Sequence, residues 1–156
     1  MPTPVNPETI EQAIIAQLSK IKRANGYDND VQAIYRIDLL EDQVQETALP
    51  ALFVLADAEG ESFEEYDAAV YVARLPIFIV GMVNETEADL TQDARVVRIN
   101  SLQRDVRKAL LEDPTFGKAC KDSVLHRVRK AIDSDRGFAR FGLEMHATYH
   151  FDRSSL

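Results

Sequence analysis

The chain has 156 residues, 46% of them hydrophobic, with one cysteine and a formal net charge of −8. This length and apolar content predict one domain with a single core across residues 1–156, and a lone cysteine excludes an internal disulfide. The negative charge disfavours nucleic acid as a tightly held partner, because binding phosphates requires clustered cations.

The first expected element is a helix that begins at Pro7. Asn6 is a suitable N-cap, and proline is favoured at the first helical position. Apolar residues then recur at helical spacing, at Ile10, Ile14, Leu18 and Ile21. We expect the last turn to hold the basic residues Lys20, Lys22 and Arg23. Asn25-Gly26 should then provide a left-handed C-cap.

Three strands are expected next. Residues 31–38 alternate between apolar and polar side chains, and residues 49–57 form a second strand with Pro50 at its start. The third is long, residues 67–84, and we expect a bulge or an exposed edge around Pro76. Its most apolar part, residues 75–83, is too short for a membrane-spanning helix, which needs about 20 residues. The first residues lack the features of a signal peptide, so we expect a soluble chain.

An acidic segment, "DAEGESFEEYD", separates the second and third strands. We expect an 11-residue loop with six acids and no base. The acids are Asp57, Glu59, Glu61, Glu64, Glu65 and Asp67.

A second, long helix is expected over residues 87–112. Thr86 and Asp89 resemble a capping box, and Pro114 ends the helix. One apolar face consists of Ile99, Leu102, Val106 and Leu110, and a second stripe lies nearly opposite, at Leu90, Ala94 and Val97. Either the helix bends around its own core, or the second stripe packs on another subunit.

The final pair of segments, residues 123–132 and 138–151, predicts a β-hairpin. In "FGLEMHATYHF" the apolar residues alternate strictly with polar residues or glycine, which indicates a strand. On a strand His146 and His150 stand about 13 Å apart, too far to share one metal ion. His126 of the partner strand could approach one of them. We expect solvated histidines here, with no metal site.

No other constellation indicates chemistry. Asp28 and Asp30 lack the later acids and the glycine of a calcium loop. The glycines are scattered, and Cys120 has no evident activating partner, so it should be a small residue beside a strand. We therefore expect no catalytic, cofactor or metal site and no enzyme.

The charge is unevenly distributed along the chain. Residues 1–94 hold 5 basic and 18 acidic side chains, a balance of −13, whereas residues 95–156 hold 13 and 8, a balance of +5. This uneven charge either keeps individual segments soluble, or it creates an acidic face on one copy that meets a basic face on the next copy.

The expected elements follow one another as a helix, three strands, a long helix and a hairpin. This order, together with the residues of particular segments, resembles a known protein family. The segments are "ANGYDNDVQAIYR", "LPALFV", the acidic loop, "LPIFIVGMV", "VRKALLEDPTFG" and "LEMHATYHF". Over residues 7–151 this resembles the tail terminator (tail completion) proteins of long-tailed bacteriophages.

The resemblance implies an α+β fold: a mostly antiparallel sheet with an N-terminal helix and a long central helix on one face, and a C-terminal β-hairpin. It implies a virion protein, assembled in the host cytoplasm, that forms a homohexameric ring at the head-proximal end of the tail. The ring would cap the tail tube protein, stop tube polymerisation and present a docking surface to the head-completion or connector protein. DNA would pass through without specific binding, and no cofactor or membrane is implied.

Within such a ring, the stripe Leu90, Ala94 and Val97 is a candidate subunit contact, and the acidic loop either lines the lumen or docks on the tube. Two alternatives remain: another head–tail connector, neck or tail-assembly protein, and a small cytosolic enzyme or ligand-binding domain.

Overall fold

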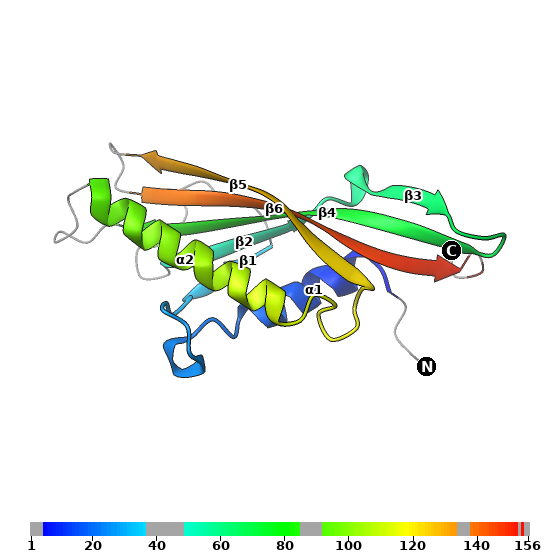
Figure 1. The fold of residues 1–156 in the computed structure, drawn as a ribbon, viewed down its shortest axis with the longest axis horizontal. Coiled ribbons are helices and arrows are strands. Elements are labelled where there is room, and N and C mark those ends of the chain that lie inside the picture. The colour runs from blue at the N-terminus through cyan, green and yellow to red at the C-terminus, as the bar shows by residue number, and fades with distance from the viewer. Residues whose placement is uncertain (1–4, 37–48, 85–91, 134–137, 153, 155–156) are drawn as a thin grey trace.

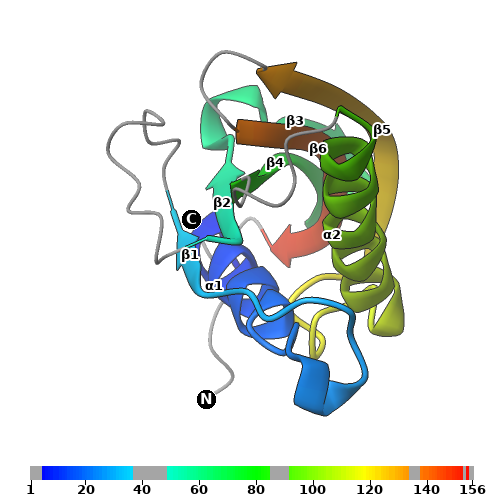
Figure 2. The same cartoon turned by 90° about the vertical axis from the view of Figure 1, so that its left-hand side faces the viewer.

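The computed structural model describes residues 5–36, 49–84, 92–133, 138–152 and 154. These residues form one twisted sheet with two helices, α1 (Pro7–Leu18) and α2 (Gln92–Glu112), against one of its faces (Figures 1 and 2). We call this the covered face and the opposite one the open face. The expected α+β class is confirmed, with both helices on one face. No helix in the described ranges combines the length and the apolar character needed to cross a membrane.

The sheet has six strands in the order β1-β2-β4-β6-β5, and β3 pairs with β4 beside that path. Their bounds are β1 (Ala33–Tyr35), β2 (Ala51–Ala56), β3 (Ser62–Glu65), β4 (Val70–Asn84), β5 (Asp122–Asp133) and β6 (Phe138–Asp152). β1 runs parallel to β2, and the other pairs are antiparallel. The predicted C-terminal pair of strands is confirmed.

The core lies between the covered face and the two helices. Both predicted apolar helix faces are buried there, Ile10, Ile14 and Leu18 of α1 and Ile99, Leu102, Val106 and Leu110 of α2. The alternating residues of β6, including Phe141 and Met145, point into the same core. Gly81 of β4 makes room for the Phe141 ring, because a Cβ at Gly81 would lie 2.2 Å from a ring carbon.

α1 begins as predicted but ends earlier. The Asn6 side chain accepts a hydrogen bond from the Thr9 N–H at 2.9 Å, and the Thr9 hydroxyl oxygen accepts one from the Asn6 N–H at 3.0 Å, which forms a capping box. The helix stops at Leu18, so the basic residues expected in its last turn follow it instead. The chain leaves the helix so that the Ile21 carbonyl can accept from the Val31 N–H at 3.1 Å. Gly26, with φ 85°, therefore caps a short 3₁₀ turn, Arg23–Asn25.

Two buried polar side chains of α1 anchor the helix, and the apolar pattern did not indicate either of them. Glu11 accepts from the Ala56 N–H at 3.0 Å and pairs with Arg36, which joins α1 to β2 and to the residue that follows β1. Gln17 donates to the Ala109 carbonyl at 3.0 Å, which joins α1 to α2. These bonds satisfy groups that burial would otherwise leave unpaired.

Of the two features expected around Pro76, the bulge is wrong, whereas a local edge position agrees with the structure. The register of β4 with β6 continues through Pro76 without a shift. On the other side, β2 ends opposite Ile77 and β3 begins opposite Arg74, so Pro76 lies between two neighbouring strands. Its carbonyl still accepts from the Asp57 N–H at 2.9 Å. The missing N–H thus faces a position where no strand needs a donor.

A second apolar cluster occupies the open face next to β1. It contains Leu49, Ala51, Phe53 and Met82, and Tyr35 stacks on Phe53 at 5.3 Å. Since Ile34 packs on the main core, both faces of β1 contact apolar residues. β1 also covers only part of the expected 31–38 segment, of which residues 37–38 lie outside the described ranges. The simple one-sided alternation predicted for this strand is therefore wrong.

Candidate interaction site

The acidic segment is not a plain loop, which corrects the sequence prediction. A 3₁₀ turn, Ala58–Gly60, leads into β3, and β3 pairs with β4 from Ser62 opposite Arg74 to Glu65 opposite Tyr71. All four residues of β3 are exposed. A strand that buries neither face has no apolar alternation, so its sequence carries no strand signal.

We define the acidic arm as residues 57–73 together with the end of β6, residues 148–152, which pairs with β4 there. Figure 1 shows this end of the sheet reaching past the two helices. The structure thus collects all six acids of the segment at one end of the molecule.

Some of these acids hold the arm together. Asp57 accepts from the Gly60 N–H at 3.1 Å, and Asp67 accepts from two backbone N–H groups at the turn into β4. A carboxylate oxygen of Glu64 lies 3.9 Å from a guanidinium nitrogen of Arg74. Asp57 and Asp67 are therefore structural, whereas Glu59, Glu64 and Glu65 are exposed.

Glu61 is bound to the sheet. The Tyr149 hydroxyl donates to Glu61 Oε1 at 2.9 Å, while Oε2 is buried without a hydrogen-bond partner among the described residues. Burial raises the pKa of Glu61 above its ordinary value, and the Tyr149 hydrogen bond opposes that shift. Burial and the neighbouring carboxylate also raise the pKa of Tyr149. Glu61 fixes the base of the arm and is not available for docking.

The arm also displays aromatic side chains. Phe63 is 57% exposed and meets Phe151 edge-on at 5.7 Å. Tyr66 is 71% exposed and stacks on His150 at 5.7 Å. Exposed aromatic rings are typical of surfaces that contact another protein.

The second stripe of the long helix is only partly visible. Leu90 and the side chain of Ala94 lie outside the described residues. Val97 is 66% exposed on α2. Its role as a subunit contact stays a prediction.

Basic side chains gather on β5, at the edge of the sheet. His126, Arg127, Arg129 and Lys130 are all exposed. Arg127 pairs with Glu144 of β6 and lowers the pKa of that carboxyl, and Lys130 donates to Asn100 of α2. Six acids of the acidic first part therefore lie on the acidic arm, and three bases of the basic second part lie on the β5 edge.

The histidines behave as expected for a strand. His146 and His150 lie on the open face, and His126 approaches His146 with ring centroids 5.4 Å apart. Within the described ranges, no group of three or more histidine, cysteine, aspartate or glutamate side chains is arranged to hold a metal ion.

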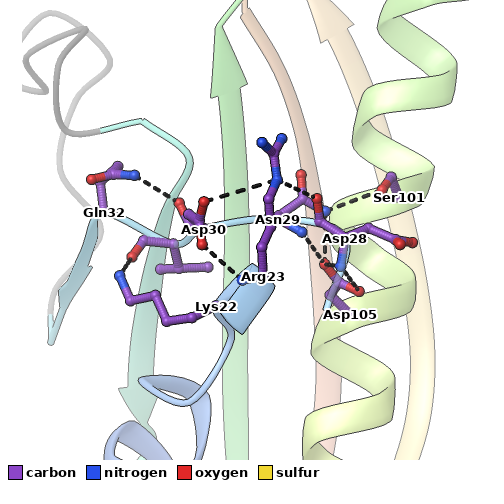
Figure 3. Close-up of polar contacts among 9 residues, drawn as sticks. Lys22, Arg23, Asp28, Asn29, Asp30, Gln32, Ser101 and Asp105 are labelled. Carbon is purple, nitrogen blue, oxygen red and sulfur yellow. Dashed lines mark hydrogen bonds and ion pairs between the residues drawn. The ribbon is translucent and has the colours of Figure 1, made fainter. Parts of the chain in front are cut away.

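Asp28 and Asp30 belong to a structural network (Figure 3). The Asp28 carboxylate contacts Arg104 at 2.6 Å, and Asp30 accepts from the Arg23 N–H at 2.7 Å. The centre of the network is Asp105, only 3% exposed, which accepts from the N–H groups of Asp28 and Asn29. The role of Asp105 was not predicted from the sequence, although a charged residue between Leu102 and Val106 on a buried face was a usable signal.

Cys120 is buried, and it lies just before β5. Burial, the largest cause, raises the pKa of its thiol to about 11. A thiol that stays protonated is a poor nucleophile.

Comparisons with known proteins leave the family open. No family model and no curated protein matches the chain. Among solved structures, one chain from the virion of a native gene transfer agent particle matches with a TM-score of 0.44 and 9% identity. The match covers 91% of this chain and 95% of that chain. Similarity at this level establishes neither a common fold nor a common function.

Proposed function

We propose that this chain is a tail terminator of a long-tailed bacteriophage. Copies form a homohexameric ring at the head-proximal end of the tail, cap the tail tube protein and stop its polymerisation. The ring then presents the surface on which the head-completion or connector protein docks. The protein acts by binding, without catalysis, and DNA passes through the ring without specific binding.

The acidic arm is the observation that carries this proposal. It extends past the helices, and β3 buries neither of its faces. Ordering such a segment costs conformational entropy that its own core contacts do not repay. A contact with another protein explains both the ordered strand and the exposed rings of Phe63 and Tyr66.

Three potentially reactive groups among the described residues have structural roles, which supports action by binding. The Cys120 thiol is buried, and burial raises its pKa to about 11. The Asp105 carboxylate holds the loop at Asp28 and Asn29, and Glu61 is bound by Tyr149.

The distribution of charge supports a ring. A ring needs a heterologous interface, in which one patch meets a different patch on the neighbour. The acidic arm and the basic β5 edge are two such patches. Six copies would carry a total charge of about −48, from −8 per chain, which would let DNA slide past.

Electron microscopy of tails assembled with and without the protein tests the function. Tubes of unlimited length without it, and of uniform length with it, are the expected result. Normal tube length in its absence would reject the proposal. Binding to a portal or connector protein, with no binding to the tube protein, would favour the alternative of another head–tail connector.

A further inference from the structure

A hollow of about 310 Å³ lies on the open face of the sheet, over Gly142 of β6. Phe141 and Leu143, on either side of Gly142, point into the core, so Gly142 faces the opposite way. Gly142 has no side chain, and a Cβ at this position would meet no atom within 4 Å. Both helices lie against the covered face, so neither of them closes the hollow (Figures 1 and 2).

The side of the hollow toward β4 is apolar. Val80 lies opposite Gly142, and Phe78 lies opposite Glu144, the next residue of β6 on the open face. Both apolar side chains are only half-buried. Leu55 of β2 lies opposite Phe78, is 44% exposed and extends the same surface. A continuous apolar surface on an uncovered sheet face indicates contact with another molecule.

The side of the hollow toward β5 is basic. Arg129 lies opposite Gly142 and is exposed. Arg127 lies opposite Glu144 and pairs with it. Two guanidinium groups and one carboxylate leave this side with a net positive charge. Because a guanidinium can stack on an aromatic ring and pair with a carboxylate, the hollow suits an aromatic side chain that has acidic neighbours.

The tip of the acidic arm carries such a side chain. Tyr66 lies at the turn between β3 and β4, which Figure 1 shows at the right-hand end of the sheet. Its ring stacks on His150 and is still 71% exposed. The residues on either side of it, Glu65 and Asp67, are acidic and exposed, and residues 57–73 contain no base.

The tip cannot reach the hollow of its own chain. The Tyr66 ring lies over His150, which is eight residues along β6 from Gly142. At the rise of an extended strand, eight residues span about 26 Å. β3 and β4 are paired up to this turn, so the tip is held at its end of the sheet. A tip that fills a hollow must therefore belong to another copy.

We propose that Tyr66 of one copy inserts into the hollow over Gly142 of the next copy, where Arg129 pairs with the acids beside the aromatic ring. The inference rests on the subunit ring of the proposed function and names one contact within it. The occupant of the hollow is a second copy of this chain, because the tip combines an exposed aromatic side chain with negative charge, and the hollow combines an apolar side with positive charge.

Charge also selects the type of contact. Two tips repel each other because both are acidic, and two hollows repel each other because both are basic. Only the unlike patches attract, and an unlike contact that is repeated by rotation closes into a ring of subunits. The tip would then lie between two copies and would neither line the lumen nor dock on the tube.

Photo-cross-linking of the full-length chain tests the contact. Tyr66 is replaced by benzoylphenylalanine, which keeps an aromatic ring at the tip and cross-links to its neighbours under light. Isotope-labelled and unlabelled copies are mixed, so that mass spectrometry separates links between copies from links within one copy. We expect links between copies that join position 66 to residues 78–80, 127–129 or 142–144.

Phe63 provides a matched control for the cross-link. It is the other exposed aromatic residue of β3 and the following turn, but it contacts Phe151 and therefore points to the covered face. Benzoylphenylalanine at position 63 should give no link to the hollow.

Substitutions at the two patches are the second arm of the test. Tyr66→Ala removes the inserted ring, and Gly142→Leu fills the hollow without meeting another atom nearby. Each should weaken self-association about tenfold or more in analytical ultracentrifugation, with the melting temperature unchanged. A mixture of the two variants should form dimers only, because one intact tip and one intact hollow remain. Phe63→Ala and Gly142→Ala are the controls and should associate as the parent does.

The outcomes separate this contact from the proposed function. No link from position 66 to the hollow above the level of the position 63 control, in free protein and on capped tubes, would overturn the contact and leave the function standing. Links from position 66 to the tube protein, or self-association that Gly142→Leu leaves unchanged, would overturn the contact as well. Tubes of normal length without the protein would instead reject the function itself.

Discussion

Replacing Asp105 with alanine tests whether one buried carboxylate holds the loop between α1 and β1. Asp105 is 3% exposed and accepts from the N–H groups of Asp28 and Asn29 at 3.1 and 2.8 Å. It also accepts from the Asn29 side chain at 2.8 Å. Alanine leaves these donors without their acceptor in a partly buried place.

The expected cost follows from those donors. Each buried donor left unpaired costs about 1–3 kcal/mol, so two backbone donors in a half-open site predict a loss of roughly 2–4 kcal/mol. For a chain of this size that loss lowers the melting temperature by about 5–15 °C. Urea unfolding measures it as a lower midpoint at unchanged slope.

Two variants of the same network provide controls. Asp105→Asn keeps one acceptor oxygen and should lose roughly half as much. Asp28→Ala removes an exposed ion pair with Arg104 and should cost less than about 1 kcal/mol. If Asp105→Ala costs no more than Asp28→Ala, the carboxylate does not hold the loop and the reasoning is wrong.

Two further predictions concern the sheet. Gly81→Ala should destabilise the chain by about 1–3 kcal/mol, because its Cβ would lie 2.2 Å from the Phe141 ring. Gly142→Ala is the control, and it should be neutral or slightly stabilising, because no atom lies within 4 Å of its Cβ. Equal midpoints of urea unfolding for the two variants would contradict the close packing of Gly81 on Phe141. Because folding raises the pKa of Glu61, the folded chain binds a proton at Glu61 more readily than the unfolded chain does. The stability that comes from this proton is lost as the pH rises from the ordinary pKa of 4.5 through the raised pKa of the folded chain. Glu61→Gln should therefore be the more stable form above that window and equal to the parent below it, and Tyr149→Phe should cost about 1–3 kcal/mol by leaving Glu61 without its donor. A difference between Glu61→Gln and the parent that does not grow with pH would show that burial of this carboxylate is unimportant.

Elements with a local signal were predicted well. The start of α1 follows from Asn6, Pro7 and Thr9, which are close in the chain. β6 follows from alternation over its whole length, and the buried face of α2 follows from its helical period. These signals act within a few residues, so they do not depend on the rest of the fold.

The features that were missed depend on partners far away in the chain. β3 exists because the long β4 offers it an edge, and the buried roles of Glu11 and Asp105 appear only when distant backbone groups reach them. The same is true of Glu61, whose partner Tyr149 is 88 residues away.

By itself, the sequence determined the α+β class, the buried helix faces, the alternating terminal strand and the separation of acidic from basic halves. Only the tertiary structure decided that six of the acids lie on an ordered arm and three of the bases on the far edge of the same sheet. The physical reason is that strand pairing joins segments of any separation, and the charge on an edge becomes a surface property only after the sheet has formed.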